Sequence, residues 1–218
     1  PFVIDSSLSN SLPQTLSNSI ELADVNNDGY TDIIVSGYDS TKFGLYIDIR
    51  LGSSGSLIQG YQTNYTTYPD TIAEYFGGIG NISLSDVNLD GGIDLYLNGS
   101  ARSRLFLNSL SGSFSQSSSW LQNMSISYSN GNFGDINMDG KPDLFIMGVN
   151  ESTDQILNKL FINDGSSFDN DLTNIFPNLV NGTSEWNDYD NDGDFDLIIS
   201  GRNADISASV TRLLKNDP

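Results

Sequence analysis

The chain has 218 residues, a formal net charge of −19 and a pI near 4.1. This acidity argues against binding to nucleic acids or anionic membranes, because both carry the same sign of charge. Cysteine and histidine are absent, which excludes disulfides, thiolate catalysis, imidazole bases and the usual zinc ligands. No apolar run approaches the about 18 residues of a membrane span, and the length suits one large all-β domain or two small ones.

Candidate strands follow one another along the chain, separated by turn residues, and no segment has a convincing helical periodicity. The first is residues 2–5 (FVID), followed by a connection rich in Ser, Asn and Pro. Four groups of strands follow, over roughly residues 18–60, 80–116, 128–170 and 183–216. The predicted strands are residues 19–23, 33–35, 43–51 and 56–59 in the first group, 81–85, 95–97, 104–108 and 113–115 in the second, 132–133, 144–146, 160–163 and 167–168 in the third, and 185–186, 197–199 and 212–216 in the fourth.

An acidic loop of nine residues lies between the first and second strands of each group. The four copies are residues 24–32 (DVNNDGYTD), 86–94 (DVNLDGGID), 135–143 (DINMDGKPD) and 188–196 (DYDNDGDFD). They hold 14 of the 28 acidic residues, and each has an Asp or Asn at positions 1, 3, 5 and 9 and Gly at position 6. The strand after each loop is apolar throughout, which is typical of a strand covered on both faces. A further Gly lies thirteen residues after the first Asp of each copy, at Gly37, Gly99, Gly148 and Gly201.

The residue types and their spacing predict that each loop binds calcium. Side-chain oxygens at positions 1, 3, 5 and 9 and the backbone carbonyl at position 7 can converge on one ion, and Gly at position 6 permits the positive φ of a tight reversal. A flexible shell made only of oxygen suits Ca²⁺ better than Mg²⁺. The alternative is an acidic turn held by side-chain hydrogen bonds to the backbone without a metal, although carboxylates packed this closely repel unless they are neutralised. We expect the fourth loop, with five Asp, to depend most on its ion. The predicted ligands of about four Ca²⁺ ions are Asp24, Asn26, Asp28, Tyr30 and Asp32; Asp86, Asn88, Asp90, Gly92 and Asp94; Asp135, Asn137, Asp139, Lys141 and Asp143; and Asp188, Asp190, Asp192, Asp194 and Asp196.

Other calcium-loop families do not fit. An EF-hand needs a Glu at position 12 and flanking helices, whereas position 12 is an apolar residue here: Val35, Leu97, Ile146 and Ile199. The loops begin 62, 49 and 53 residues apart, which is too far for tandem nonapeptide repeats and is in the range of four-stranded propeller blades.

The loop followed by an apolar strand and Gly, and then by L-F-[LI]-N, resembles the FG-GAP/VCBS repeats of integrin-α-like β-propellers. The resemblance covers nearly the whole chain. It implies a β-propeller-like fold of four blade repeats, each of about four antiparallel strands, with a calcium loop between the first and second strands. The Gly-Ala-Pro that names the family is absent, and the usual seven blades are not all here.

The N-terminal segment bears on how the repeats are arranged. Phe2 lies 22 residues before the next acidic loop, Phe114 lies 21 residues before its loop and Phe168 lies 20 residues before its own. Residues 2–5 are therefore a candidate fourth strand beside residues 212–216, which would close a ring and hide an edge. The alternatives are that the chain is a portion of a larger propeller, or that residues 2–5 pair with a neighbouring molecule.

Other features are less specific. The sequons at Asn64, Asn123, Asn150 and Asn181 fall in predicted loops and are candidate N-glycosylation sites. Trp120 and Trp186 are expected in the core. The aromatic residues Tyr61, Tyr65, Tyr68, Tyr75 and Phe76 either form a binding surface or pack beneath a long connection.

Together these features predict a binding protein and not an enzyme, because no pair of catalytic residues stands out. We expect a secreted or cell-surface, calcium-stabilised module for adhesion, recognition or structural assembly, with a protein or glycan ligand or with self-assembly through the terminal strands. The alternative is a carbohydrate-binding lectin.

Overall fold

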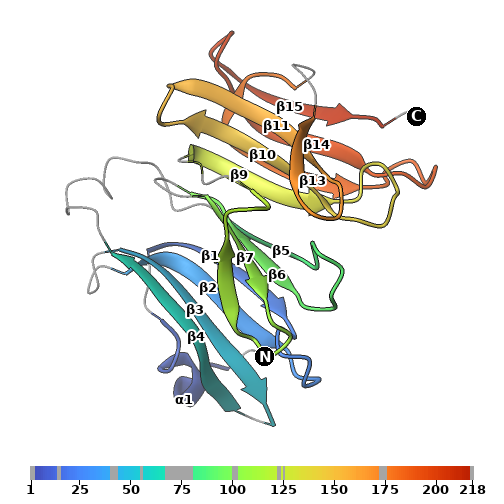
Figure 1. Cartoon of the computed structure of the whole chain (residues 1–218). Helices are drawn as coiled ribbons and strands as arrows, with labels where there is room; N and C mark the ends of the chain where they lie inside the picture. Colours follow the sequence, from blue (N-terminus) through green and yellow to red (C-terminus); the bar gives the residue numbers. More distant parts are fainter. Residues whose placement is uncertain are drawn as a thin grey trace.

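A computed structural model describes residues 3–13, 16–39, 44–54, 56–66, 81–99, 103–121, 124, 126–171 and 176–216. Apart from α1 (Ser6–Ser9), a single helical turn, the regular elements of these residues are all β-strands. The all-β prediction is therefore confirmed. The strands form separate antiparallel sheets, which follow one another along the chain from one end of the molecule to the other (Figure 1).

Strands that neighbour each other in a sheet also follow each other in sequence. The first sheet contains β1 (Leu16–Ala23), β2 (Asp32–Asp39), β3 (Gly44–Ser53) and β4 (Ser56–Thr66). The second contains β5 (Ile82–Ser85), β6 (Asp94–Leu97), β7 (Arg104–Asn108) and β8 (Phe114–Ser117), and the third contains β9 (Ile126–Gly134), β10 (Asp143–Asn150), β11 (Gln155–Asn163) and β12 (Phe168–Asp171). The fourth contains β13 (Leu179–Asn187), β14 (Asp196–Asn203) and β15 (Ala208–Leu214).

Each acidic loop connects the first and second strands of its sheet, as the sequence predicted. The strands β9 and β13 are much longer than predicted, since only residues 132–133 and 185–186 of them were expected to be strand. Both strands are rich in Ser, Asn and Gly, residues with low intrinsic strand propensity. Their pairing partners in β10 and β14 outweigh that local preference.

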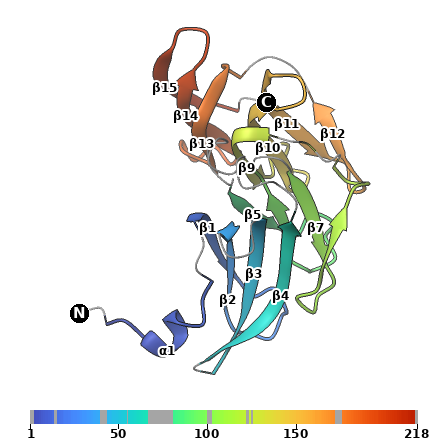
Figure 2. The ribbon, with the colours of Figure 1, turned by 90° about the vertical axis from the view of Figure 1, so that its left-hand side faces the viewer.

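The prediction of a strand at residues 2–5 is wrong for residues 3–5, which belong to no strand. The chain turns into α1 instead, because Oδ1 of Asp5 accepts the backbone N–H of Leu8 at 3.1 Å and caps the helical turn. This segment lies beside the first sheet, at the opposite end of the molecule from β15 (Figures 1 and 2). The sheets are therefore not closed into a ring by residues 3–5.

Three hydrophobic cores lie between successive sheets. The second strands β6 and β10 contribute to the cores on both of their faces: Leu95 and Leu97 of β6 lie in the core shared with the first sheet, and Tyr96 lies in the core shared with the third. The prediction of a strand covered on both faces is wrong for β14, where Ile198 is 45% exposed. All four residues of β6 are buried, which confirms that this strand is covered on both faces. Trp120 and Trp186 are partly buried and pack against the second and third cores.

The first strands of successive sheets lie side by side in chain order. Ile82 N–H donates to Oγ of Ser19 at 3.1 Å, and Gly131 N–H donates to Oδ1 of Asn81 at 3.0 Å. Close approach at this seam requires glycine, because a Cβ on Gly134 would come within 2.8 Å of the ring of Trp186. Side-chain bonds to the backbone and ring contacts therefore join β1, β5, β9 and β13.

An asparagine at or just after the end of the third strand joins the second, third and fourth sheets each to the acidic loop of the sheet before it. Nδ2 of Asn108 donates to the carbonyl of Val25 at 2.7 Å, and Nδ2 of Asn163 donates to the carbonyl of Val87 at 2.8 Å. Asn216 makes the same bond, at 2.8 Å, to the carbonyl at position 2 of the third loop. These are the asparagines of the L-F-[LI]-N pattern and its fourth-group counterpart, and they set the spacing between repeats.

Replacement of Asn163 by Ala should destabilise the protein by about 1–3 kcal/mol, because two carbonyls, those of Val87 and Pro142, lose their hydrogen-bond donor in a buried position. In urea unfolding, the midpoint should fall accordingly. The matched control is Asn178→Ala. The exposed side-chain amide of Asn178 donates a hydrogen bond to Asp205, and its loss should change stability by no more than about 0.5 kcal/mol. Equal midpoints for the two variants would contradict this role.

Candidate metal-binding loops

The four acidic loops share one backbone conformation. Gly at position 6 has φ of 87°, 91°, 83° and 100° in the successive loops, as the sequence predicted. Position 4 is also left-handed, with φ of 57°, 57°, 57° and 62°, and this was not predicted. Asn tolerates that region, but Leu89 and Met138 adopt it at a steric cost. The Asn residues at this position in the first and fourth loops, Asn27 and Asn191, were the sequence feature that could have predicted the left-handed conformation.

Position 1 closes each loop by accepting two backbone bonds. Oδ1 of Asp24 accepts the N–H of Asp28 at 3.1 Å, and Oδ2 accepts the N–H of Gly29 at 2.8 Å. Asp86, Asp135 and Asp188 make the same pair of bonds, at 2.8–3.1 Å. The carboxylate therefore faces the inside of the turn in all four copies.

Positions 3, 5 and 7 continue the same network. Oδ1 of Asn26 accepts the N–H of Asp28 at 3.3 Å, and Oδ1 of Asp28 accepts the N–H of Tyr30 at 2.9 Å. In the other loops, the backbone N–H groups of Gly92, Lys141 and Asp194 donate to the position 5 carboxylate in the same way. An acidic turn without a metal would contain these same hydrogen bonds. Each accepting oxygen nevertheless keeps a second lone pair that could bind an ion.

The Asp at position 9 connects three segments of its sheet. Asp32, Asp94, Asp143 and Asp196 are all buried, with at most 1% of their surface exposed. Oδ2 of Asp94 accepts the N–H of Val87 at 3.0 Å, and Oδ1 accepts the N–H of Asn108 at 2.8 Å. The other three make the equivalent bonds at 2.7–3.3 Å. Sequence reasoning assigned this residue to the ion alone and missed its bond to the third strand.

Burial makes three of these carboxylates, those of Asp32, Asp94 and Asp143, difficult to ionise. It raises the pKa of Asp94 to about 6, and backbone hydrogen bonds from Asn108 and Val87 oppose this shift only in part. Burial likewise raises the pKa of Asp32 and of Asp143, and the charges of the carboxylates at positions 5 and 1 raise these pKa values further. A cation in the loop would remove this electrostatic cost.

The fourth loop brings most acidic groups together. Asp188, Asp190 and Asp196 each offer a carboxylate oxygen within 4.8 Å of the other two. Oδ1 of Asp194 is buried and accepts no hydrogen bond from the described residues, and burial followed by the charge of Asp192 raises the pKa of Asp194. An oxygen without a donor beside three converging carboxylates fits a hard cation.

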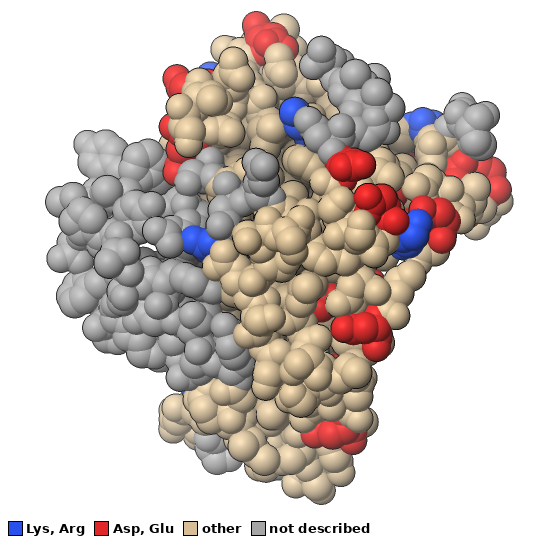
Figure 3. Space-filling model, viewed as in Figure 1, with Lys and Arg blue, Asp and Glu red and all other residues tan. Residues whose placement is uncertain are grey.

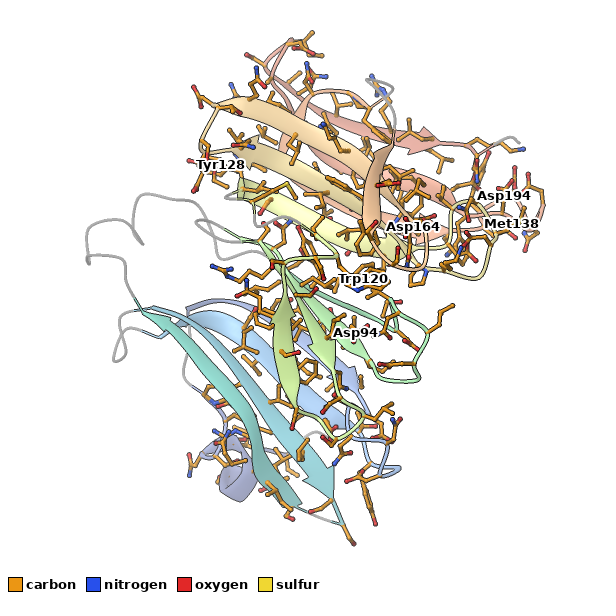
Figure 4. All side chains as sticks on the ribbon, in the orientation of Figure 1. Asp94, Trp120, Tyr128, Met138, Asp164 and Asp194 are labelled. Carbon is orange, nitrogen blue, oxygen red and sulfur yellow. The ribbon has the colours of Figure 1, made fainter. Side chains whose placement is uncertain are left out.

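Lysines already neutralise part of two loops. Lys215 Nζ lies 2.9 Å from Oδ2 of Asp190 and 3.2 Å from Oδ2 of Asp192 in the fourth loop. Lys141 Nζ lies 2.6 Å from Oδ2 of Asp139 in the third loop. The third and fourth loops lie at the same end of their sheets, where Met138 and Asp194 are labelled in Figure 4. Acidic side chains gather on the corresponding side of the surface in Figure 3.

The remaining predicted site residues do not join these loops. The prediction that the sequons fall in loops is wrong for Asn150, the last residue of β10, and for Asn181, which lies in β13. Asn150 is half-buried and accepts backbone bonds from Ser152 and Thr153, whereas Asn181 is exposed in a left-handed conformation with φ of 52°. Asn123 and the side chain of Asn64 lie outside the described residues. So do the side chains of the aromatic set, Tyr61, Tyr65, Tyr68, Tyr75 and Phe76.

Comparisons with known proteins identify the repeat. Residues 86–146, from the second loop to the strand after the third, match the model of FG-GAP-like repeats. A search of curated proteins gives no match. A structure of an Agrocybe aegerita lectin, described as recognising non-reducing terminal N-acetylglucosamine, matches with 16% identity and a TM-score of 0.49. The match covers 92% of this chain and 53% of the lectin chain, so this chain spans about half the lectin's length. In the part of the chain that the structure describes, no helix is long and apolar enough to cross a membrane.

In metal-free buffer, stability should fall as pH rises from about 4 to above 6. The pKa of Asp94 is about 6 in the folded protein and about 4 in an unfolded chain. The folded state therefore binds the proton more tightly in this window, and its advantage is lost as the pH passes the folded pKa. Urea unfolding at several pH values measures the slope.

The Asp94→Asn variant should show a weaker pH dependence than the wild type, even though the variant itself is less stable. Asp154→Asn, an exposed position outside the loops, should leave the slope unchanged. A wild-type slope in Asp94→Asn would contradict the assignment of this pH dependence to the buried carboxylate.

Proposed function

We propose that the chain is a secreted, calcium-stabilised β-propeller module for adhesion, recognition or structural assembly. The observation that carries the proposal is the fourfold recurrence of one loop geometry at one place in every sheet. Each loop turns Asp and Asn oxygens at positions 1, 3 and 5 toward its own interior, next to a buried Asp at position 9. The FG-GAP-like match over residues 86–146 agrees with a repeat of this kind.

The arrangement of the sheets supports the propeller part of the proposal. Successive antiparallel sheets pack face to face, and their first strands lie side by side. Residues from β1, β5, β9 and β13 line a groove of about 420 Å³, including Glu21, Ile82, Asn132 and Trp186. Blades around an axis place their first strands in this relation, so the groove corresponds to the axis of an incomplete ring.

The electrostatics of the loops support calcium. The net charge is −19, and each loop holds at least three carboxylates with at most one lysine beside it among the described residues. Oxygen ligands on flexible turns suit the larger Ca²⁺ ion. Extracellular calcium modules bind at about 0.1–1 mM, which is consistent with a structural ion in a secreted protein. The proposal includes no catalytic step.

Calcium should raise the melting temperature, and a chelator should lower it. An ion present at ten times its dissociation constant contributes about 1.4 kcal/mol per site, which corresponds to about 3–6 °C for a chain of this length. Differential scanning fluorimetry with calcium, magnesium and chelator measures the shift, and titration calorimetry counts the ions.

Replacement of the position 1 carboxylate in Asp86→Ala should remove one ion and about one site's share of the calcium-dependent shift. Asp154→Ala, which changes the net charge equally outside the loops, should keep the full shift. A melting temperature that does not respond to calcium or chelator would contradict the proposal that the protein binds calcium.

Carbohydrate binding is the second candidate function, and the groove is the observation in its favour. The rings of Phe133 and Trp186 line it beside the carboxylates of Glu21 and Glu185 and the amide of Asn132. Aromatic faces with nearby polar groups suit a sugar ring. Binding on a glycan array that is lost in Trp186→Ala, while calcium-dependent melting is kept, would favour this function. Absence of binding to any glycan would reject it.

A further inference from the structure

The groove along the first strands is lined by equivalent positions of all four repeats. Its volume of about 420 Å³ lies within the range of small-molecule sites, about 300–1,000 Å³. Each first strand contributes a polar residue three positions before its acidic loop and an apolar residue two positions before it. The polar residues are Glu21, Ser83, Asn132 and Glu185, and the apolar residues are Leu22, Leu84, Phe133 and Trp186. The groove therefore combines aromatic and aliphatic surface with oxygen-bearing side chains.

Two of the polar side chains make hydrogen bonds within the protein. Nδ2 of Asn132 donates to the carbonyl of Ser184, and Oδ1 of Asn132 accepts a bond from Nδ2 of Asn81 at 3.3 Å. Oγ of Ser83 accepts the N–H of Phe133 at 3.3 Å. Asn132 therefore holds neighbouring first strands together, whereas the hydroxyl of Ser83 can still donate to a ligand.

The aromatic side of the groove is held in a fixed orientation. Nε1 of Trp186 donates to the carbonyl of Asn132 at 3.4 Å, and its ring meets the ring of Phe145 edge to face, with centroids 6.3 Å apart. Phe133 stacks on Phe168 with centroids 6.2 Å apart. Rings that are already ordered lose little conformational freedom when a ligand packs on them.

The two carboxylates of the groove have no counter-ion in the described part of the chain. Neither Glu21 nor Glu185 forms an ion pair with a described lysine or arginine, and no basic residue is among the described residues that line the groove. Burial, followed by the charge of Glu185, raises the pKa of Glu21. Since two like charges face the same space, a positively charged group in the groove would be stabilised.

This charge distinguishes between classes of carbohydrate. An acidic sugar would bring a further negative charge into the groove of a chain whose net charge is −19. A neutral sugar would leave both carboxylates without a counter-ion. A protonated amine forms charge-assisted hydrogen bonds with carboxylates and also interacts favourably with the face of an aromatic ring. The groove is therefore complementary to a sugar that carries an amine.

We propose that the groove binds an amino sugar, whose protonated amine pairs with the carboxylates of Glu21 and Glu185 and whose apolar ring face packs on Trp186. The inference rests on the carbohydrate-binding function proposed above and names the class of sugar. It does not depend on calcium. The hydroxyl groups of the sugar are acceptors for Ser83 that a simple amine lacks.

Two trisaccharides that differ in acetylation test the role of charge. Titration calorimetry compares the trimer of glucosamine with the trimer of N-acetylglucosamine, with calcium in every arm. At about pH 6 an amine with a pKa of about 7.7 is protonated. The glucosamine trimer should bind at least about tenfold more tightly, because bonds to charged groups contribute more than neutral ones. Salt should reduce this advantage. Equal affinities would overturn the inference and leave carbohydrate binding in place.

The variants Glu21→Gln and Glu185→Gln assign the charge effect to the groove. Each should weaken binding of the glucosamine trimer by about tenfold and leave binding of the acetylated trimer unchanged. Removal of one of two like charges should not lower the melting temperature, so both variants should fold. Asp154→Asn, which makes the same charge change at an exposed position outside the groove, is the control and should keep the wild-type affinity. An equal loss in Asp154→Asn would mean general attraction to an acidic protein and would overturn the inference.

Tryptophan fluorescence tests the location. The chain has two tryptophans, so Trp120→Phe leaves Trp186 as its single indole. Saturation with the glucosamine trimer should change the emission of this variant, because the sugar packs on the remaining ring. Unchanged emission with binding intact would place the sugar elsewhere and overturn the inference.

Spermidine, which also carries three amines, distinguishes an amino sugar from a simple amine. It should bind at least several-fold more weakly than the glucosamine trimer, because it offers no ring face to Trp186 and no hydroxyl to Ser83. Equal binding of spermidine would overturn the assignment to a sugar. Absence of binding by both trimers, with the calcium-dependent melting shift kept, would reject carbohydrate binding together with this inference and leave the calcium-stabilised module in place.

Discussion

The buried carboxylate at the last position of each acidic loop is the interaction on which the fold depends. Each of these Asp side chains accepts one N–H from the start of its loop and one from the end of the third strand. Three separate segments of a sheet therefore meet at one residue. Burial makes the charge of Asp32, Asp94 and Asp143 costly, so the groups that align the strands also produce the negative potential that a cation would neutralise.

Contacts between sheets extend this order along the chain. The carbonyl of Val25 or Val87, next to the N–H that the position 9 Asp accepts, receives the amide of the asparagine in the following sheet. Alternating apolar residues of β6 and of β10 face two different cores. A repeat therefore buries its faces against its neighbours in the chain.

The function that we propose assigns different roles to the acidic loops and to the groove along the first strands. The loops gather acidity at one end of the sheets, where we propose a structural ion, whereas the groove along the first strands is the surface that we propose for a ligand. Glu21 and Glu185 face the same groove, and burial followed by the charge of Glu185 raises the pKa of Glu21. None of the predicted metal ligands lines the groove, so the two proposed roles can be tested by separate substitutions.

The sequence by itself determined the all-β class, the four repeats and the position of every acidic loop between a first and a second strand, because period-2 apolar runs and the Asp-Asn-Gly spacing are local signals. It also identified the glycine of positive φ at position 6. Only the tertiary structure decided the full length of β9 and β13, since their Ser, Asn and Gly residues form strands only against buried neighbours. It alone placed the position 9 Asp at the third strand and the asparagines between sheets, because these bonds join residues 14 to 83 positions apart. It also overturned the strand at residues 3–5: the local pattern suits a strand, but a strand needs a partner strand, and Asp5 caps the helical turn α1 instead.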